Sequence, residues 1–296
     1  TSSDSVSVAG QVSVNIISSL TEASVLNQAN LQAHHITITA TEKSSILAIA
    51  GALAYGGKAG IGASVAWNQI RSVDNPEKAG AVTAYIKDSD VKALGDITLK
   101  ADSTNDILAV TVAAGASQEG MAAALSVSMN IIDADTQAYI IGKKSVGIDA
   151  DGAITLEAIN QSSILAVAGN VTYSKTASIG VAGSYNEISG TIKAHIGEEN
   201  ILETIVKADS LSIEALSAAY IFSVSAGGSI SSGQAAVNGS VSINTINNDI
   251  GAYIQNATVE VVNSIELIAK DKSEITSIAG AVGGSQSVAV GAALAV

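Results

Sequence analysis

The stretch SSILAVAGNVTYSKTASIGVAGSYNEI, residues 162–188, decides how this chain folds. It is nearly all small or apolar, yet it contains glycines, a central lysine, Lys175, and an asparagine, Asn186, near its end. A membrane segment, a buried helix and a β-hairpin with both faces hidden all suit such a composition. β-branched residues and glycine dominate and no helical apolar stripe appears, which argues against a helix. The polar turn around Lys175 therefore predicts a β-hairpin with this lysine at its tip.

The same pattern returns along the whole chain as an internal repeat. Successive copies begin 61, 57, 57 and 54 residues apart. Their first strands read ITITA from residue 36, ITLKA from 97, ITLEA from 154, LSIEA from 211 and IELIA from 265. One such repeat cannot bury its own apolar face, so copies must stack. We therefore predict an all-β fold, an elongated β-solenoid or β-helix of ~57-residue repeats that each contain an Ala- and Gly-rich β-hairpin.

We expect residues 1–296 to form a single elongated repeat domain. A partial repeat covers 1–35, full repeats start near 36, 97, 154 and 211, and a further partial repeat covers 265–296. Because the chain begins and stops inside repeats, we expect it to be a section of a longer array. One copy carries an insertion, RSVDNPEK at residues 71–78, whose Pro76 suits a surface loop.

The strands of each repeat present two kinds of face. In ITLKA, Ile97, Leu99 and Ala101 alternate with polar residues, which indicates a half-buried strand with one wet face. The next segment alternates instead between bulky and small residues, and we expect it to be buried on both faces. The bulky face would fill a core, and the small face would let another sheet approach closer than the usual ~10 Å between packed sheets. The bulky positions are Leu47, Ile49, Leu108, Val110, Leu165, Val167, Phe222 and Val224, and the small ones are Ala48, Ala50, Ala109, Thr111, Ala166, Ala168, Ser223 and Ser225.

Two residue types recur at fixed places and would form columns in a stack. An asparagine follows each start by 32 or 33 residues, at Asn68, Asn130, Asn186 and Asn244, with Asn15 in the preceding partial copy. Either these amides hydrogen-bond along the axis as an asparagine ladder, or each asparagine starts a turn; both interpretations stay open. A second column comprises Tyr85, Tyr139, His195 and Tyr253, which we interpret as structural packing rather than a ligand site.

Composition excludes several function classes. The net charge is −13 and only 14 Lys and Arg residues are present, which argues against nucleic acid and against anionic membrane surfaces as partners. Cysteine is absent, so the chain has no disulfide, no zinc-thiolate site and no thiol nucleophile.

Histidines and glycine-rich segments do not indicate a metal or phosphate site. His34 and His35 are adjacent, which would place them on opposite faces of a strand, and His195 belongs to the tyrosine column. The segments GGKAG and GAVGG lack the spacing of a phosphate-binding loop, and we expect both in turns between strands.

Acidic residues offer two further candidates. Asp149 and Asp151 with Gly152 would make at most a weak calcium site, and a solvated turn is the favoured interpretation. Glu157 and Glu214 match in register but lie on the exposed face of an ordinary strand, which does not suit a pair of glycosidase carboxylates. We therefore assign no catalytic, cofactor-binding or metal-binding residue and expect no enzymatic activity and no cofactor.

The combination ITLEA, SSILAVAG, IGVAGSYNEI and KAHIG resembles the repetitive segments of giant bacterial surface and secreted proteins. The nearest likeness is to filamentous-haemagglutinin-like adhesins and fusobacterial-type leukotoxins that are exported by two-partner secretion. The likeness covers essentially the whole chain, but the period is longer than in the haemagglutinin pattern. It implies a right-handed β-solenoid shaft, an extracellular or cell-surface location and contact with host cells. No site residue of these families can be placed on this sequence.

We therefore expect a non-catalytic structural shaft segment of a large extracellular adhesin or toxin. Its expected partners are a host or neighbouring-cell surface, reached through the full-length protein, and adjacent repeats of the same chain, with lateral self-association left open. One alternative is a membrane-inserted or pore-forming β-assembly, although neither strand face reads as polar and aromatic residues are only 3% of the chain. Another is a polysaccharide-acting β-helix protein, which should have a groove of acidic, basic and aromatic residues on successive coils, and we find none.

Overall fold

A computed structural model describes residues 5–72, 82–142, 147–199 and 204–296. These residues form strands joined by turns and contain no helix, which confirms the all-β prediction. The predicted insertion at residues 71–78 includes Pro76, and its residues 73–78 lie outside the described residues. The strands are β1 (Val6–Ser19), β2 (Thr21–Val25), β3 (Asn30–Ala33), β4 (Ile36–Gly56), β5 (Ala59–Ser72), β6 (Val82–Lys87), β7 (Asp90–Ala93), β8 (Ile97–Ser117), β9 (Met121–Asp133), β10 (Thr136–Ile141), β11 (Gly147–Ala150), β12 (Ala153–Ser174), β13 (Ala177–Ile196), β14 (Thr204–Ser231), β15 (Ala235–Ile254), β16 (Ala257–Asp271), β17 (Glu274–Gly284) and β18 (Val288–Ala295).

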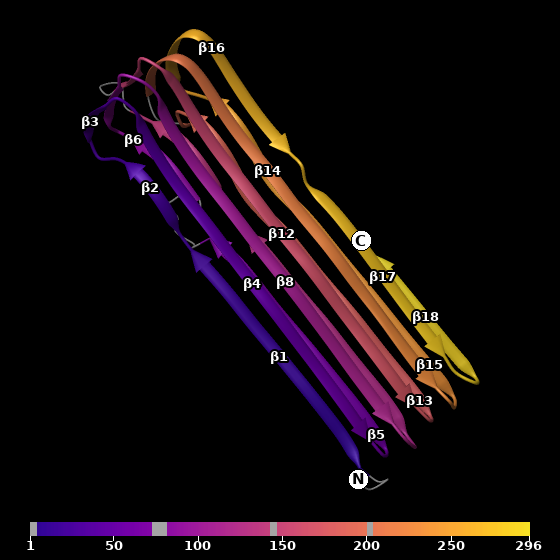
Figure 1. Ribbon diagram of the computed structural model, residues 1–296. Coiled ribbons are helices and arrows are strands. Elements are labelled where there is room, and N and C mark those ends of the chain that lie inside the picture. Colours follow the sequence, from indigo (N-terminus) through magenta and orange to yellow (C-terminus); the bar gives the residue numbers. More distant parts are fainter. Residues whose placement is uncertain (1–4, 73–81, 143–146, 200–203) are drawn as a thin grey trace.

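The strands form two nine-stranded sheets, and every strand pair among the described residues is parallel. One sheet, called sheet A, contains the long strands β1, β5, β9, β13, β15 and β18 and the short strands β2, β6 and β10. The other, sheet B, contains the long strands β4, β8, β12, β14, β16 and β17 and the short strands β3, β7 and β11. Each coil runs along one sheet and returns along the other, so its hydrogen bonds go to the coils before and after it (Figure 1). Ile154 pairs with Ile97 on one side and Leu211 on the other, so the predicted repeat starts lie in register. This stacking confirms the β-solenoid.

The predicted hairpins are β-arches in the structure. The turn at Lys175 joins β12 to β13 as expected, but β12 pairs with β8 and β14, whereas β13 pairs with β9 and β15. The two arms therefore belong to opposite sheets and meet through side chains. The strands are also longer than predicted, since ITLEA and SSILAVAG belong to the single strand β12. No Gly or Pro lies between these two motifs, so nothing in the local sequence interrupts the extended backbone.

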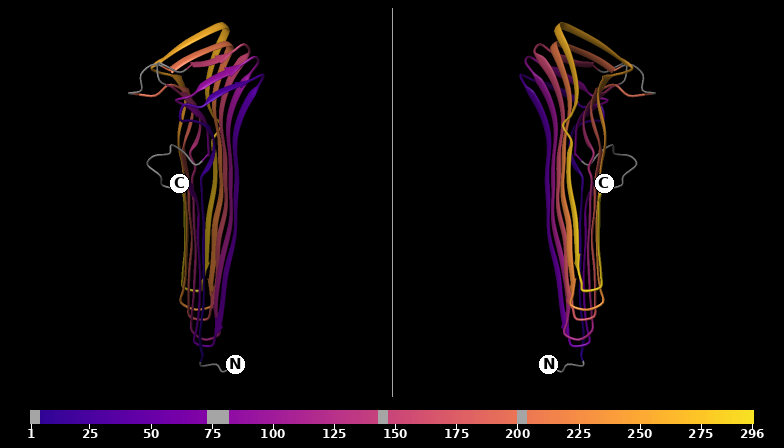
Figure 2. Two further views of the ribbon diagram at one scale, coloured as in Figure 1. Left: turned by 90° about the vertical axis from the view of Figure 1, so that its left-hand side faces the viewer. Right: turned by 90° about the vertical axis from the view of Figure 1, so that its right-hand side faces the viewer.

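The coil is wide at one end and thin at the other. Figure 2 shows the sheets separating at the end that carries the short strands and running close together toward the opposite end. At the wide end, Ile, Leu, Val and Ala side chains from the two sheets form the main core, with Ile154, Leu156 and Ile192 fully buried. A second, narrower core lies farther along, where Ile164 and Ile188 from the facing sheets are buried. We call the remaining thin part, which ends in the turns at Lys58, Glu119 and Lys175, the blade.

In the blade, the small residues face inward and the bulky ones face solvent, so the predicted placement of the bulky face in a core is wrong. Ala166 and Ala168 are 0% exposed, whereas Leu165 of the same strand is 40% exposed and Val171 60% exposed. β12 is an inner strand of sheet B, so this exposure does not come from an open edge. The prediction that the small face meets another sheet closely is correct, and it explains the inversion, because no room for bulky side chains remains between the sheets.

Glycines mark how close the two backbones come. A Cβ atom added at Gly60 would lie 2.1 Å from the carbonyl oxygen of Ala116 in the opposite sheet, and one added at Gly62 would lie 2.3 Å from that of Ala114. A Cβ at Gly115, in β8, would lie 2.2 Å from the carbonyl oxygen of Ala123. These distances are shorter than any van der Waals contact, so the blade requires glycine at these inward positions.

The blade interior is polar as well as narrow. Ser184 Oγ lies 3.0 Å from Ser225 Oγ in the facing sheet and 2.9 Å from Ser242 Oγ in the next coil. Nearer the tip, the amide groups of Asn170 and Asn238 are 2.7 Å apart. Short hydroxyl and amide side chains fit the narrow space, and those that hydrogen-bond with one another offset the cost of their burial, whereas the Oγ atoms of Ser64 and Ser240 are buried without a partner.

The recurring asparagines form a ladder, which decides between the two interpretations of these residues. Each Nδ2 donates to the Oδ1 of the asparagine in the next coil, and every one of these bonds is 2.8 Å long. The ladder runs through Asn15, Asn68, Asn130, Asn186 and Asn244. Asn68, Asn130 and Asn186 are fully buried. The ladder therefore ties the register of each coil to its neighbours at the base of the blade.

We predict that Asn186→Ala lowers the free energy of unfolding by roughly 2–4 kcal/mol. The substitution leaves the Oδ1 of Asn244 without its donor and removes one of the two acceptors of Asn130 Nδ2, which keeps its 2.9 Å hydrogen bond to Ser128 Oγ. Each buried polar group that loses its partner costs about 1–3 kcal/mol. Asn247→Ala, an exposed change on β15, is the matched control and should stay within about 0.5 kcal/mol of the original chain. Denaturant unfolding measures both, and equal losses for the two variants would refute a stabilising ladder.

Candidate functional site

The tyrosine column exists as predicted, in sheet A at the wide end. Tyr85, Tyr139, His195 and Tyr253 stack with ring centroids 4.8, 5.2 and 4.8 Å apart. His195 is 5% exposed, and its Nδ1 lies 2.8 Å from the carbonyl oxygen of Gly197. Burial lowers the pKa of His195 more than the hydrogen bond to Gly197 raises it, and the positive charge of Lys193 adds a smaller lowering. The imidazole is therefore a neutral, packed member of the column.

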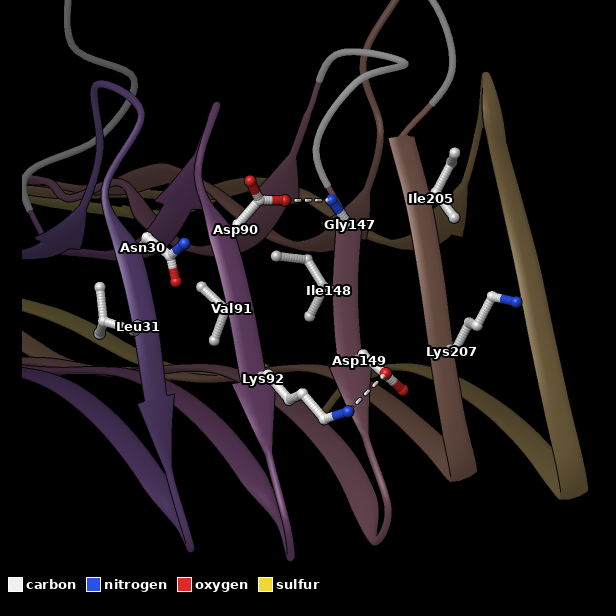
Figure 3. Close-up of a pocket in the computed structure, with 10 residues that line it drawn as sticks. All are labelled: Asn30, Leu31, Asp90, Val91, Lys92, Gly147, Ile148, Asp149, Ile205 and Lys207. Atoms are coloured by element: carbon white, nitrogen blue, oxygen red, sulfur yellow. Dashed lines mark hydrogen bonds and ion pairs between the residues drawn. The ribbon is translucent and has the colours of Figure 1, made fainter.

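A depression of about 270 Å³ lies over β3, β7, β11 and the start of β14 (Figure 3). It forms where Gly147 provides no side chain between Asp90 and Ile205. The carboxylate of Asp90 accepts a hydrogen bond of 2.9 Å from the backbone N–H of Gly147. This hydrogen bond already engages the acidic group at the rim.

The other charges around this depression pair with one another. Lys92, Asp149, Lys207 and Glu260 are register partners on successive coils, so positive and negative charges alternate along the stack. Lys92 Nζ lies 3.8 Å from Asp149 Oδ2, and Lys207 Nζ lies 2.7 Å from Glu260 Oε2. These pairs are about half exposed, so they contribute little stability. Their geometry suits a solvated, charge-balanced surface rather than a reaction.

The residues of the weak calcium candidate make other contacts in the structure. Asp149 pairs with Lys92, while the backbone N–H groups of Asp151 and Gly152 donate to the carbonyl oxygens of Ala93 and Gly95 in the preceding coil. Across the described parts of the chain, no group of three or more His, Cys, Asp or Glu side chains could hold a metal ion.

The two adjacent histidines do not lie on opposite faces of a strand, so that prediction is wrong. They occupy the bend between β3 and β4, where strand alternation does not apply, and their ring centroids are 4.4 Å apart. His35 Nδ1 lies 3.6 Å from Asp96 Oδ2 and accepts a 3.1 Å hydrogen bond from the backbone N–H of Asp96. His34 and His35 therefore belong to the connection between coils.

The remaining candidates lie on regular strands or turns. Glu157 and Glu214 are register partners on the outer face of sheet B, and Glu157 lies 3.6 Å from Lys100. GGKAG forms the turn between β4 and β5 as predicted, whereas GAVGG belongs to the strand β17, so its predicted turn is wrong. Glycine suits that strand because Gly283 faces the opposite sheet, where an added Cβ would lie 2.8 Å from the carbonyl oxygen of Val290.

An apolar surface that the sequence analysis missed lies on both outer faces of the blade. Here, the outward positions are apolar, small or aromatic, and none is charged. Exposed members include Val171 and Tyr173 on sheet B and Ile179 and Trp67 on sheet A. Across sheet B, a groove of about 580 Å³ runs over the small outward residues Gly169, Ala226 and Gly280. Such contiguous apolar surface is typical of interaction sites.

Comparisons with known proteins give no match, whether with a protein-family model, a curated protein or a solved structure. A search of the described residues for a helix long and apolar enough to cross a membrane finds none.

We predict that His195→Tyr makes folding less sensitive to acid. Because burial lowers the pKa of His195 below its unfolded value of about 6.5, this residue stabilises the fold fully above that pH and loses the contribution as pH falls toward the folded pKa. Tyrosine already occupies the equivalent position in three other coils. A tyrosine side chain, whose ordinary pKa is about 10, stays neutral over the pH range of this experiment. Between about pH 8 and about pH 5.5, the original chain should lose more unfolding free energy than the variant. Equal losses would contradict a buried neutral imidazole.

Proposed function

We propose that this chain is a non-catalytic structural segment of a large extracellular bacterial protein and that it supports adhesion to a host or neighbouring cell. The proposal rests on the continuous register of the coils, in which the asparagine ladder and the ring column pass through successive repeats. In such a stack, each coil contacts only its neighbours, and added coils lengthen the structure along its axis. This arrangement suits a shaft that separates other parts of a protein. The resemblance of the repeats to adhesin and leukotoxin segments supplies the extracellular and adhesive part.

No specific observation favours the polysaccharide-acting alternative. The charged groups that could act on a sugar pair across coils, as in Lys100 with Glu157 and Lys92 with Asp149. The rings of the column stack on one another rather than lining a groove.

The dimensions of the coil make the proposal testable by imaging. Strands of 21 to 28 residues in sheet B span about 70–90 Å across the axis, whereas each coil adds only about 4.8 Å along it. Electron micrographs of the longer protein that contains this chain should therefore show a flat ribbon of about that width. Compact globules or beads on a flexible string would contradict a stacked shaft.

The location is tested on intact cells that produce the protein. Antibodies against this segment should label these cells without permeabilisation, and added protease should remove the signal. Labelling that appears only after permeabilisation would contradict the extracellular part of the proposal.

A further inference from the structure

The uncharged surface of the blade has a defined height. On sheet B, the outward positions from Leu165 to Tyr173 carry no charge, and those from Ala177 to Tyr185 on sheet A carry none either. At about 3.3 Å per residue, each of these segments spans about 27 Å. We call the outward positions of these segments, in all described coils, the apolar belt. On sheet B, the belt comprises the outward residues within 47–55, 108–116, 165–173, 222–230 and 276–284. On sheet A, it comprises those within 6–14, 59–67, 121–129, 177–185, 235–243 and 288–294.

Charged residues lie beyond both margins of the belt. At the tip, three of the five turns between the described blade strands carry a charge, at Lys58, Glu119 and Lys175. On the opposite side, charges begin with Asp106 on sheet B and Glu187 on sheet A. The blade thus has a charged, an uncharged and a charged layer, and this order matches the layers of a lipid bilayer, whose hydrocarbon core is about 30 Å thick.

Aromatic residues mark the same margins. Tyr55 and Tyr173 lie at the tip margin of the belt on sheet B. Trp67 and Tyr185 lie at the opposite margin on sheet A, and Tyr220 lies just outside that margin on sheet B. No aromatic ring points outward in the middle of the belt among the described residues. Trp and Tyr prefer this position at the interfaces of a membrane.

Inside the blade, the chemistry is that of a segment surrounded by lipid. Backbone groups of the inner coils hydrogen-bond to the neighbouring coils, as lipid requires. The inward side chains are small, and several are Ser or Asn with partners such as Ser184 with Ser242 and Asn170 with Asn238. Outward apolar positions therefore alternate with inward positions that are small and in part polar, as outward apolar and inward polar positions alternate in transmembrane strands.

We propose that the blade inserts edge-on into a lipid bilayer, tip first, with the apolar belt in the hydrocarbon core. The outer faces of both sheets in the blade are apolar and exposed to water. A two-fold dimer would bury only one of these faces, whereas a bilayer would surround both. The net charge of −13 favours zwitterionic over anionic lipid. The outermost strands of each sheet have an open edge. In the proposed inserted state, this edge hydrogen-bonds to further coils or to other copies of the chain. This inference is independent of the proposed shaft role, which depends on ribbon shape and cell-surface location.

Single-cysteine probes test the insertion, because the chain has no cysteine of its own. We would place an environment-sensitive dye at Val171→Cys on sheet B, at Ile179→Cys on sheet A and, as a control, at Thr155→Cys, which faces outward on β12 outside the belt. On addition of phosphatidylcholine vesicles, the first two dyes should shift to the blue and become protected from iodide, and the control should not. Trp67, the single tryptophan, should be quenched by brominated lipid.

Three results of this experiment would overturn the proposal. A response at only one of the two belt positions would indicate that the blade lies flat on the membrane. Protection that appears without vesicles and grows with protein concentration would indicate self-association of the belt. Equal emission with and without vesicles at both positions would exclude lipid binding.

Charge substitution gives an independent readout. Val112→Lys combined with Val181→Lys, at the middle outward positions of the belt on the two sheets, should reduce partition into phosphatidylcholine vesicles roughly tenfold or more, because lysine is costly near the bilayer midplane. Thr155→Lys places the same charge on β12 outside the belt and should leave partition unchanged. Circular dichroism and a thermal melt establish that each variant is folded before it is compared. A folded double variant that binds vesicles as well as the original chain would refute insertion.

Discussion

The structure depends on the close contact of two parallel sheets along the blade. The backbones approach so closely that Gly60, Gly62 and Gly115 have no space for a Cβ atom. Only alanine, glycine, serine and the occasional asparagine or threonine fit between the sheets. Bulky residues on the same strands must then face outward, so one steric constraint determines both the polar interior and the apolar exterior.

The constraint relaxes along each coil, and the interior changes accordingly. Ile164 and Ile188 meet where the sheets begin to separate, and Ile154 and Leu156 fill the wider end. The asparagine ladder lies between the isoleucines and the thin blade. There, a register slip of one residue would turn every inward amide outward and break the ladder. The ladder thus gives specificity at a place where small, interchangeable side chains give little.

The sequence predicted the repeat, the all-β solenoid, the tip at Lys175 and the close contact of the small faces. It also predicted the ring column, but it left the ladder and the turn as two open interpretations of the asparagines. It misplaced the bulky face because alternation of side chains shows that two faces differ, but not which one faces inward. Glycine could not have decided this, because Gly62 and Gly180 face inward whereas Gly169 and Gly280 face outward.

Other errors had local causes. Hairpin and arch have the same turn and the same alternation, and they differ only in which strands are hydrogen-bonded, which depends on the neighbouring coils. His34 and His35 were placed by strand alternation, although they lie in a bend. The apolar belt was missed for the same reason as the inversion, since an outward apolar face cannot be recognised before the inward face is known.

Cysteine accessibility along β12 tests the central claim most directly. Leu165→Cys and Val167→Cys should react rapidly with maleimide in the folded chain, whereas Ala166→Cys and Ala168→Cys should react only on unfolding. The reverse pattern, with the alanine positions reactive and the bulky positions protected, would contradict the account.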